Sequence, residues 1–156
     1  MKYTFSQIFR KELKGLNVTV VRKRFVRRMG EVSYLDDGTF TIKVPSVTDV
    51  FNLGVAFHEI GHVKLKHKPI ELDDLDYSSE VRDEYHAERF AISKLRQYGF
   101  HLDEYRDEYR RYVKRAKEYV CEHIVYEHKK RKIKKVPQYI KDWLGEHYTK
   151  LRIRKL

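Results

Sequence analysis

The residues best suited to chemistry lie in one short stretch, His58-Glu59-Ile60-Gly61-His62. If this stretch is helical, the four-residue spacing brings both imidazoles to one face, where they can share a metal ion about 2.0–2.1 Å from each nitrogen. Glu59 points to the same open side, where it can accept a proton from a metal-bound water. The pattern therefore predicts a metal site with a general base beside it. The alternative is a helix in which the two histidines are merely packed.

A second segment offers two acidic side chains for the same site. Glu84 lies 22 residues beyond His62, and Glu88 follows one helical turn later. Both fall on the face of a predicted helix that should be buried, where a carboxylate requires a cation. A catalytic zinc usually has three protein ligands, so we interpret Glu84 as the third ligand and Glu88 as the acceptor for the free N–H of His58 or His62. The alternative is a rotated helix with both glutamates facing solvent.

Two helices must position these residues. The first is expected to begin after a cap at Ser46 or Thr48 and to continue to about His67. Its inward stripe contains Phe51, Val55, His58, His62 and Leu65, at spacings of three and four residues. The second helix is expected over residues 79–98 and should end at Gly99. Packed together, these helices would bring the histidines of the first to the glutamates of the second.

Strands are expected before the first of these helices. Residues 17–28 and 31–44 are rich in β-forming side chains, and the second segment has a hairpin signal at Asp37-Gly38. We therefore expect a small antiparallel sheet from residues 17–44. A long helix is expected over residues 103–130, where the spaced tyrosines should contact the core, and a short helix over residues 140–148.

Composition defines the broad class of the protein. The chain of 156 residues has a net charge of +11 and is 41% apolar, which argues against wholesale disorder. No run approaches the roughly 20 apolar residues of a membrane helix, so we expect no membrane span. The lone Cys121 cannot form an intramolecular disulfide, and residues 1–10 lack the pattern of a secretory signal. We therefore expect a cytoplasmic protein.

The stretch VAFHEIGHVKLKH, followed by EYHAERFAISKL, resembles the ImmA/IrrE family of zinc metallopeptidases. The family pattern is a helix with HELGH, a further apolar-x-x-His, and then E-x-x-A-N-x-F-A-x-x-L. By this resemblance His58, His62 and Glu84 occupy the zinc-ligand positions, and Glu59 is the general base. Glu88 departs from the usual Asn or Asp. Packing positions of the second helix are matched by Ala87, Phe90, Ala91 and Leu95.

The resemblance implies a zinc-dependent endopeptidase that hydrolyses a peptide bond in a specific intracellular protein. Several family members are paired with a helix-turn-helix repressor that they cleave or inactivate, so a DNA-binding transcriptional repressor is the expected substrate. Family proteins are typically cytoplasmic or carried by phages and mobile elements. In the implied mechanism zinc lowers the pKa of its water toward about 7, and Glu59 removes the proton before attack on the peptide carbonyl.

The resemblance also implies a role for the strand before the zinc helix. In zincins such a strand commonly lies along the cleft and pairs with an extended substrate through backbone hydrogen bonds. The residues assigned to it are Thr39, Phe40, Thr41, Ile42, Lys43 and Val44. For the group that stabilises the oxyanion, His86, Tyr77 and Tyr85 are all candidates. His67 matches a family position, but we expect it to point elsewhere on its helix, as a packing or surface residue.

The complete pattern predicts an α+β fold that is mostly helical. We expect a zincin-like metallopeptidase domain over residues 1–100, with a small antiparallel sheet. A helical, basic C-terminal extension over residues 101–156 should pack on it.

Charge is distributed unevenly and supports a second hypothesis. Residues 22–28 carry five basic side chains, and residues 129–156 carry eleven basic and two acidic ones, whereas residues 71–109 carry twelve acidic and five basic ones. The basic C-terminus could make weak nucleic-acid contacts. The alternative to a peptidase is therefore a non-catalytic, zinc-containing basic module that binds nucleic acid or a protein partner. Glu59 separates the two hypotheses, because a structural zinc site has no use for a base.

Overall fold

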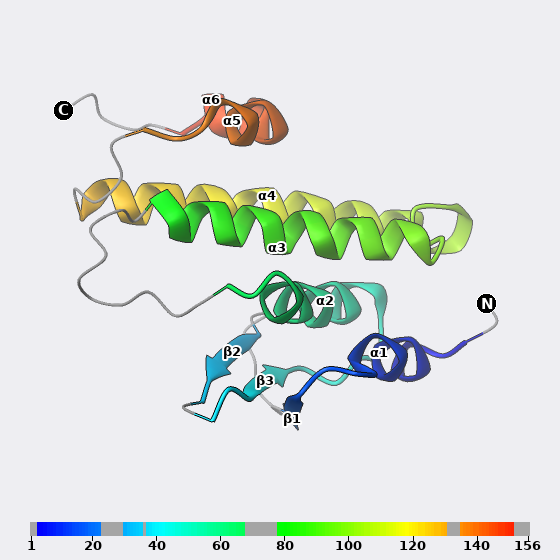
Figure 1. Cartoon of the computed structure of the whole chain (residues 1–156). Helices are drawn as coiled ribbons and strands as arrows, with labels where there is room; N and C mark the ends of the chain where they lie inside the picture. The colour runs from blue at the N-terminus through cyan, green and yellow to red at the C-terminus, as the bar shows by residue number, and fades with distance from the viewer. Residues whose placement is uncertain (1–2, 23–29, 36, 68–77, 131–134, 152–156) are drawn as a thin grey trace.

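The computed structural model describes residues 3–22, 30–35, 37–67, 78–130 and 135–151. Over these residues the chain has an α+β fold made mostly of helices, as predicted. The elements in order are α1 Phe5–Leu13, β1 Val18–Arg22, β2 Glu31–Tyr34, β3 Phe40–Val44, α2 Val50–Lys64, α3 Ser78–Gln97, a 3-10 turn Asp103–Tyr105, α4 Arg106–Lys129, α5 Gln138–Leu144 and α6 Glu146–Thr149. In Figure 1 the strands lie on one side of α2, α3 and α4 run side by side on the other, and α5 and α6 lie beyond α4.

The sheet has the strand order β1-β3-β2. The predicted hairpin is confirmed, because β2 pairs with β3 in antiparallel register. The sheet as a whole is mixed rather than antiparallel, because β1 pairs with the other edge of β3 in parallel register. Burial explains why β3 is central: Ile42 and Val44 are fully buried, and a strand enclosed by two neighbours and covered by a helix buries such residues best.

This strand order overturns the role predicted for residues 39–44. β3 is paired with β1 along its whole length and with β2 over four of its five residues, so its backbone N–H and C=O groups are engaged within the sheet. It therefore has no free edge on which a substrate could form a further strand. Within the described part of the chain, β2 is the edge strand nearer to Glu59, because Gly30, just before β2, lies against the Glu59 side chain.

Helix α2 begins later than predicted. Its N-cap is Asp49, whose side chain accepts a 2.7 Å hydrogen bond from the backbone N–H of Asn52. Ser46 and Thr48 therefore lie before the cap, although both have suitable side chains. An aspartate at this position satisfies one of the free N–H groups of the first turn and interacts favourably with the helix dipole.

Helix α2 also ends earlier than predicted. Its last residue is Lys64, and Lys66 adopts a φ of 56°, which no residue in a right-handed helix can have. Between its ends α2 is enclosed by α1, α3, α4 and the strands, and all residues from Leu53 to Val63 are buried. The histidines and Glu59 of this helix therefore lie inside the molecule.

Helix α4 is part of the same packing as the helix that carries the histidines. Tyr112 and Ala116 of α4 belong to the main hydrophobic core, together with Phe57 and Ile60 of α2. A second, smaller core joins α3, α4 and α5 through Val81, Val120, Ile124, Ile140 and Leu144. The side chains of α4 are thus close enough to α2 and α3 to take part in any site between them.

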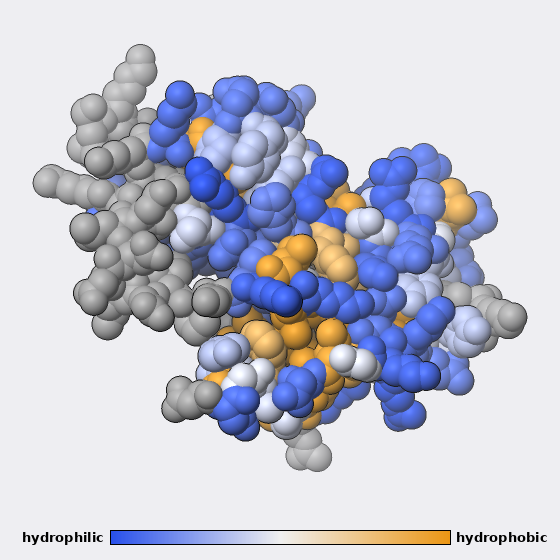
Figure 2. Space-filling view, viewed as in Figure 1, coloured by the Kyte–Doolittle hydropathy of each residue, from blue (hydrophilic) through white to orange (hydrophobic). Residues whose placement is uncertain are grey.

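The surface reflects this layering. On the face shown in Figure 2, hydrophobic residues gather at the level of α2 and the strands, whereas hydrophilic residues predominate over the helices above them. Among the described helices, none combines the length and the apolar character needed to cross a membrane.

Candidate metal centre

Helix α2 places the two motif histidines against each other. Both are buried, and their Nε2 atoms lie 3.0 Å apart, as the i, i+4 spacing predicts. Gly61, between them in sequence, packs directly on the backbone of Ala87 in α3. A side chain at position 61 would crowd that backbone, so the glycine allows α3 to approach the histidines closely. The residue types of the motif therefore serve both the site and the contact between the two helices.

Glu84 of α3 completes a group of three possible metal ligands. Its Oε2 atom lies 3.2 Å from His58 Nε2 and 3.7 Å from His62 Nε2. Donor atoms of these three residues all lie within 4.8 Å of one another, so they could hold one metal ion. Glu84 Oε2 is buried and makes no well-formed hydrogen bond with the described residues, which is unusual for a carboxylate oxygen. The predicted third ligand is thus brought to the two histidines.

Glu88 lies on the outer side of His58, as expected from its position one turn after Glu84. Its Oε1 atom is 3.3 Å from His58 Nδ1, the nitrogen that points away from His62. Its Oε2 atom accepts a 2.8 Å hydrogen bond from the Tyr112 hydroxyl of α4, which also lies 3.0 Å from the carbonyl oxygen of Gly54. Tyr112 therefore holds Glu88 beside the ligand. This contact was not predicted, although a tyrosine on a buried stripe needs a partner for its hydroxyl.

The carboxylates and imidazoles of the cluster shift each other's pKa values. Burial would lower the pKa of His58, but the carboxylates of Glu88 and Glu84 raise it well above its ordinary value. Burial would raise the pKa of Glu84, but the neighbouring imidazoles of His58 and His62 hold it well below its ordinary value. The carboxylates of Glu59, Glu84 and Glu88 thus surround two imidazoles, an arrangement that favours a cation in their midst.

Glu59 has the environment of a proton acceptor. It is buried, and burial raises the pKa of its carboxyl group, with His58 and His62 acting in the opposite direction. A raised pKa brings a carboxylate closer to the range in which a general base works well. Gly30 lies so close to the Glu59 carboxyl group that a Cβ atom there would overlap it. The backbone before β2 thus limits where the Glu59 side chain can lie.

A cavity of about 40 Å³ opens beside Glu59 and His58. This volume is enough for at least one water molecule, which needs about 10–15 Å³. Tyr119 of α4 lines it, with its ring set edge-on to His58 at a centroid distance of 5.7 Å. Arg115 lies at the same cavity and forms a paired contact with Glu122, at 2.8 and 3.0 Å. Helix α4 therefore supplies one wall of this cavity.

The oxyanion candidates taken from the sequence do not line this cavity. Tyr85 packs on Trp143 in the second core, and His86 is exposed, with its ring against Tyr139. Tyr77 lies outside the described residues. Tyr119 was assigned to the core on its helical spacing, yet it faces the cavity and its hydroxyl has no hydrogen-bond partner among the described residues. Its separation of seven residues from Tyr112, two helical turns, is the signal that could have placed both on the site face of α4.

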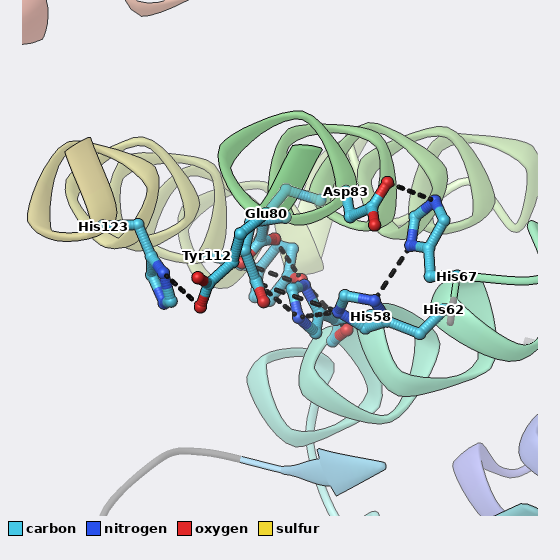
Figure 3. Close-up of polar contacts among 10 residues, drawn as sticks. His58, His62, His67, Glu80, Asp83, Tyr112 and His123 are labelled. Carbon is cyan, nitrogen blue, oxygen red and sulfur yellow. Dashed lines mark hydrogen bonds and ion pairs between the residues drawn. The ribbon is translucent and has the colours of Figure 1, made fainter. Parts of the chain in front are cut away.

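His67 does not point away from the site, contrary to the prediction. Its Nδ1 atom lies 2.9 Å from Nδ1 of His62, and its Nε2 atom lies 3.5 Å from Oδ1 of Asp83 on α3. Figure 3 shows these contacts as a row from Asp83 through His67 to His62. Burial and the neighbouring His62 lower the pKa of His67 to about 4. Both candidate histidine ligands thus have a polar partner on the side away from Glu84.

Comparisons with known proteins add no family to this description. No protein-family model matches the chain, and no curated protein and no solved structure matches it either. The interpretation of the site therefore depends on its own geometry and chemistry.

The structure describes the basic segments only in part. Most of residues 22–28, and residues 131–134 and 152–156 of the basic C-terminus, lie outside the described residues. Nucleic-acid contact by these segments stays a prediction from the sequence.

Proposed function

We propose that the chain is a zinc-dependent endopeptidase that hydrolyses a peptide bond in a specific intracellular protein. The observation that carries the proposal is the separation of three donor atoms. His58 Nε2, His62 Nε2 and Glu84 Oε2 lie 3.0, 3.2 and 3.7 Å from one another. Ligands about 2.0–2.1 Å from a tetrahedral ion are about 3.3 Å apart. The three atoms are therefore spaced as ligands of one shared ion would be.

The chemistry of the donors supports zinc. Two imidazole nitrogens and one carboxylate oxygen form a known catalytic zinc set, and three protein ligands leave a fourth position open. The buried, poorly hydrogen-bonded Oε2 of Glu84 needs a cation to offset its desolvation. When bound, zinc would polarise the carbonyl of the scissile bond and make a water molecule beside it more acidic.

Glu59 is the residue that moves the proton in the proposed reaction. It lies next to His58 in sequence and lines the same cavity, which can hold a water molecule. Its carboxylate would take a proton from the attacking water and then give it to the leaving amine, as general base and general acid in turn. Burial favours this use, because it raises the pKa of the carboxyl group.

Tyr119 is the residue we assign to the oxyanion. Its ring stands beside His58, and its side chain lines the cavity that contains Glu59. The hydroxyl group has no acceptor among the described residues, so it is available to donate to an oxygen that becomes negative during attack. Burial raises the pKa of Tyr119, and the nearby Glu84 and Glu59 raise it further, so the phenol keeps its proton.

The substrate class follows from the resemblance of the two helices to the ImmA/IrrE family. That resemblance supports a helix-turn-helix repressor in the cytoplasm as the substrate. Because β3 is enclosed, an extended segment of the substrate would add to the outer edge of β2, next to Gly30 and the base.

Metal analysis combined with Glu59→Gln tests this proposal. Both the unaltered protein and the variant should contain one zinc per chain, because Glu59 is not a ligand. Cleavage of a repressor encoded beside this chain should fall by about 10²–10⁴-fold in the variant, since the proton acceptor is lost. Glu146→Gln, the same chemical change at an exposed position of α6, should leave both zinc content and cleavage unchanged.

Two results would contradict the proposal. Absence of bound zinc in the unaltered protein would leave His58 and His62 as packed helix residues. Stoichiometric zinc with equal behaviour of both Glu→Gln variants and tight binding to nucleic acid would instead favour the non-catalytic module.

A further inference from the structure

The end of helix α2 is built in an unusual way. The backbone N–H of Lys66 donates to the carbonyl of Val63 at 3.2 Å, and that of His67 donates to the carbonyl of His62 at 3.0 Å. This pair of bonds, around Leu65 as the C-cap, is a Schellman motif. The left-handed position of such a motif normally holds glycine, whereas here Lys66 adopts it with a φ of 56°. A residue with a Cβ in this conformation costs about 1 kcal/mol or more.

The motif brings His67 back over His62. On a continuing helix His67 would lie about 140° round the axis from His62, since each residue turns about 100°. The reversal at Lys66 instead places the His67 ring 5.0 Å from the His62 ring. In most Schellman motifs the residues at these two positions make an apolar contact. Here the contact is polar, with the two Nδ1 atoms 2.9 Å apart.

When His62 binds a metal through Nε2, the hydrogen bond between His62 and His67 can have only one donor. In that state His62 carries its proton on Nδ1 and can only donate there. His67 must then accept on its own Nδ1 and carry its proton on Nε2. That atom faces Oδ1 of Asp83 at 3.5 Å, and the His67 side chain is only 11% exposed. Donors and acceptors therefore alternate correctly from the ligand to the carboxylate.

We propose that His67, oriented by Asp83, is a positioning residue that holds the His62 ligand in its metal-binding tautomer and ring orientation. This inference rests on the proposed zinc site but concerns a different residue pair. Partners of this kind typically contribute 10–100-fold to metal affinity. On the other ligand, His58, the corresponding place is taken by Glu88, which Tyr112 holds. Each of the two ligands thus has its own polar partner, and α3 contributes to both supports, through Asp83 for His62 and through Glu88 for His58.

Zinc affinity of His67 variants tests the proposal. Zinc would be titrated in competition with a chromophoric chelator, and cobalt(II) absorption would report the coordination geometry. His67→Phe keeps a ring but removes its nitrogens, so zinc affinity should fall by about 10–100-fold. His67→Asn places an amide oxygen near the position of Nδ1 and should restore affinity to within about threefold. The control is His128→Phe, which makes the same change in another helix, α4. It should have no effect on either readout.

The rescue by asparagine separates positioning from packing, because a purely structural role would favour phenylalanine. Should His67→Phe fail to fold, Asp83→Ala tests the same pair at a side chain that is 32% exposed. It should weaken zinc binding by about tenfold. Zinc affinity of His67→Phe or Asp83→Ala equal to that of the unaltered protein would overturn this inference alone. An unaltered protein that binds no zinc would overturn the proposed function together with it.

Discussion

Two clusters of polar side chains, each around a buried carboxylate, join helices α2 and α3, and they differ in how their carboxylates are neutralised. In the first, which we call the lysine cluster, Glu12 of α1 accepts hydrogen bonds from Lys64 at 2.9 Å, Lys94 at 3.0 Å and the hydroxyl of Tyr98 at 2.9 Å. Burial would raise the pKa of Glu12, but these partners hold it below its ordinary value. Permanent positive charge from the chain itself satisfies this carboxylate.

The second cluster contains His58, His62, Glu59, Glu84 and Glu88, and no lysine or arginine makes an ion pair with its carboxylates among the described residues. In the part of the chain that the structure describes, the groups of this cluster that can become positive are its imidazoles, which do so by taking up protons. The raised pKa of His58 reflects this arrangement. Comparison of the clusters therefore teaches that burial of carboxylates is not itself a sign of function. Among the described residues, the second cluster differs from the first because its carboxylates have no lysine or arginine as an ion-pair partner.

Among the substitutions that distinguish the two clusters, removal of the Glu84 side chain should have the largest effect, and this effect is on zinc affinity. In Glu84→Ala the proposed third ligand is lost, and zinc affinity should fall by at least about 10³-fold, or about 4 kcal/mol. Zinc titration against a chelator would measure it. Glu80→Ala, one turn earlier on α3, should change affinity by less than about threefold. If Glu84→Ala bound zinc normally, the third ligand would be another residue.

Tyr119→Phe should affect the reaction but not the metal. Loss of the hydroxyl removes a donor to the developing oxyanion, so kcat should fall by about 10²-fold. KM and zinc affinity should stay within about threefold, because the ring and the ligands are unchanged. Tyr126→Phe, seven residues later at an exposed position of α4, serves as the control. Equal kcat for the two variants would remove Tyr119 from the mechanism.

Glu12→Gln should weaken the fold but not the metal site. The variant removes the charge that Lys64 and Lys94 share, and the free energy of unfolding should fall by about 2 kcal/mol. Urea unfolding at pH 7 would measure the loss, and zinc affinity should be unchanged. A large loss of zinc affinity with unchanged stability would show that the two clusters are not separate in function.

The contribution of Glu12 should also depend on pH. Because its folded-state pKa lies below the ordinary value of 4.5, its ionised form stabilises the native state above that value. This stabilisation is lost as the pH falls through the folded-state pKa. The difference in unfolding free energy between the unaltered protein and Glu12→Gln should therefore be largest at neutral pH and should shrink below about pH 4. A difference that is the same at pH 7 and pH 3 would contradict the assignment.

Much of the candidate site could be predicted because its residues repeat at helical spacing. His58 and His62 share one face of α2, and Glu84 and Glu88 share one face of α3, whatever the rest of the chain does. The hairpin of β2 and β3 was predictable for a similar reason, since its strands adjoin a short turn with a glycine. These are local properties, and local geometry follows directly from the order of residue types.

Contacts between distant segments could not be predicted in this way. The pattern of apolar residues places Tyr112 and Tyr119 on a buried stripe, but it does not say which helix they face. Strand order is equally non-local, so the sequence did not reveal that β3 is enclosed or that β2 is the edge strand nearer to Glu59. The position of His67 was missed because helical spacing assumes that the helix continues, whereas Lys66 reverses the chain.

The sequence by itself thus determined the three candidate ligands and the candidate base beside them, because i, i+4 neighbours share a helix face in any fold. Only the tertiary structure decided what surrounds them: Glu88 bonded to Tyr112, His67 in contact with both His62 and Asp83, and Tyr119 at the cavity that Glu59 lines. The physical reason is that these contacts depend on how α3, α4 and the end of α2 pack together. That packing is set by the sum of many weak interactions across the core, which spacing along the chain does not encode.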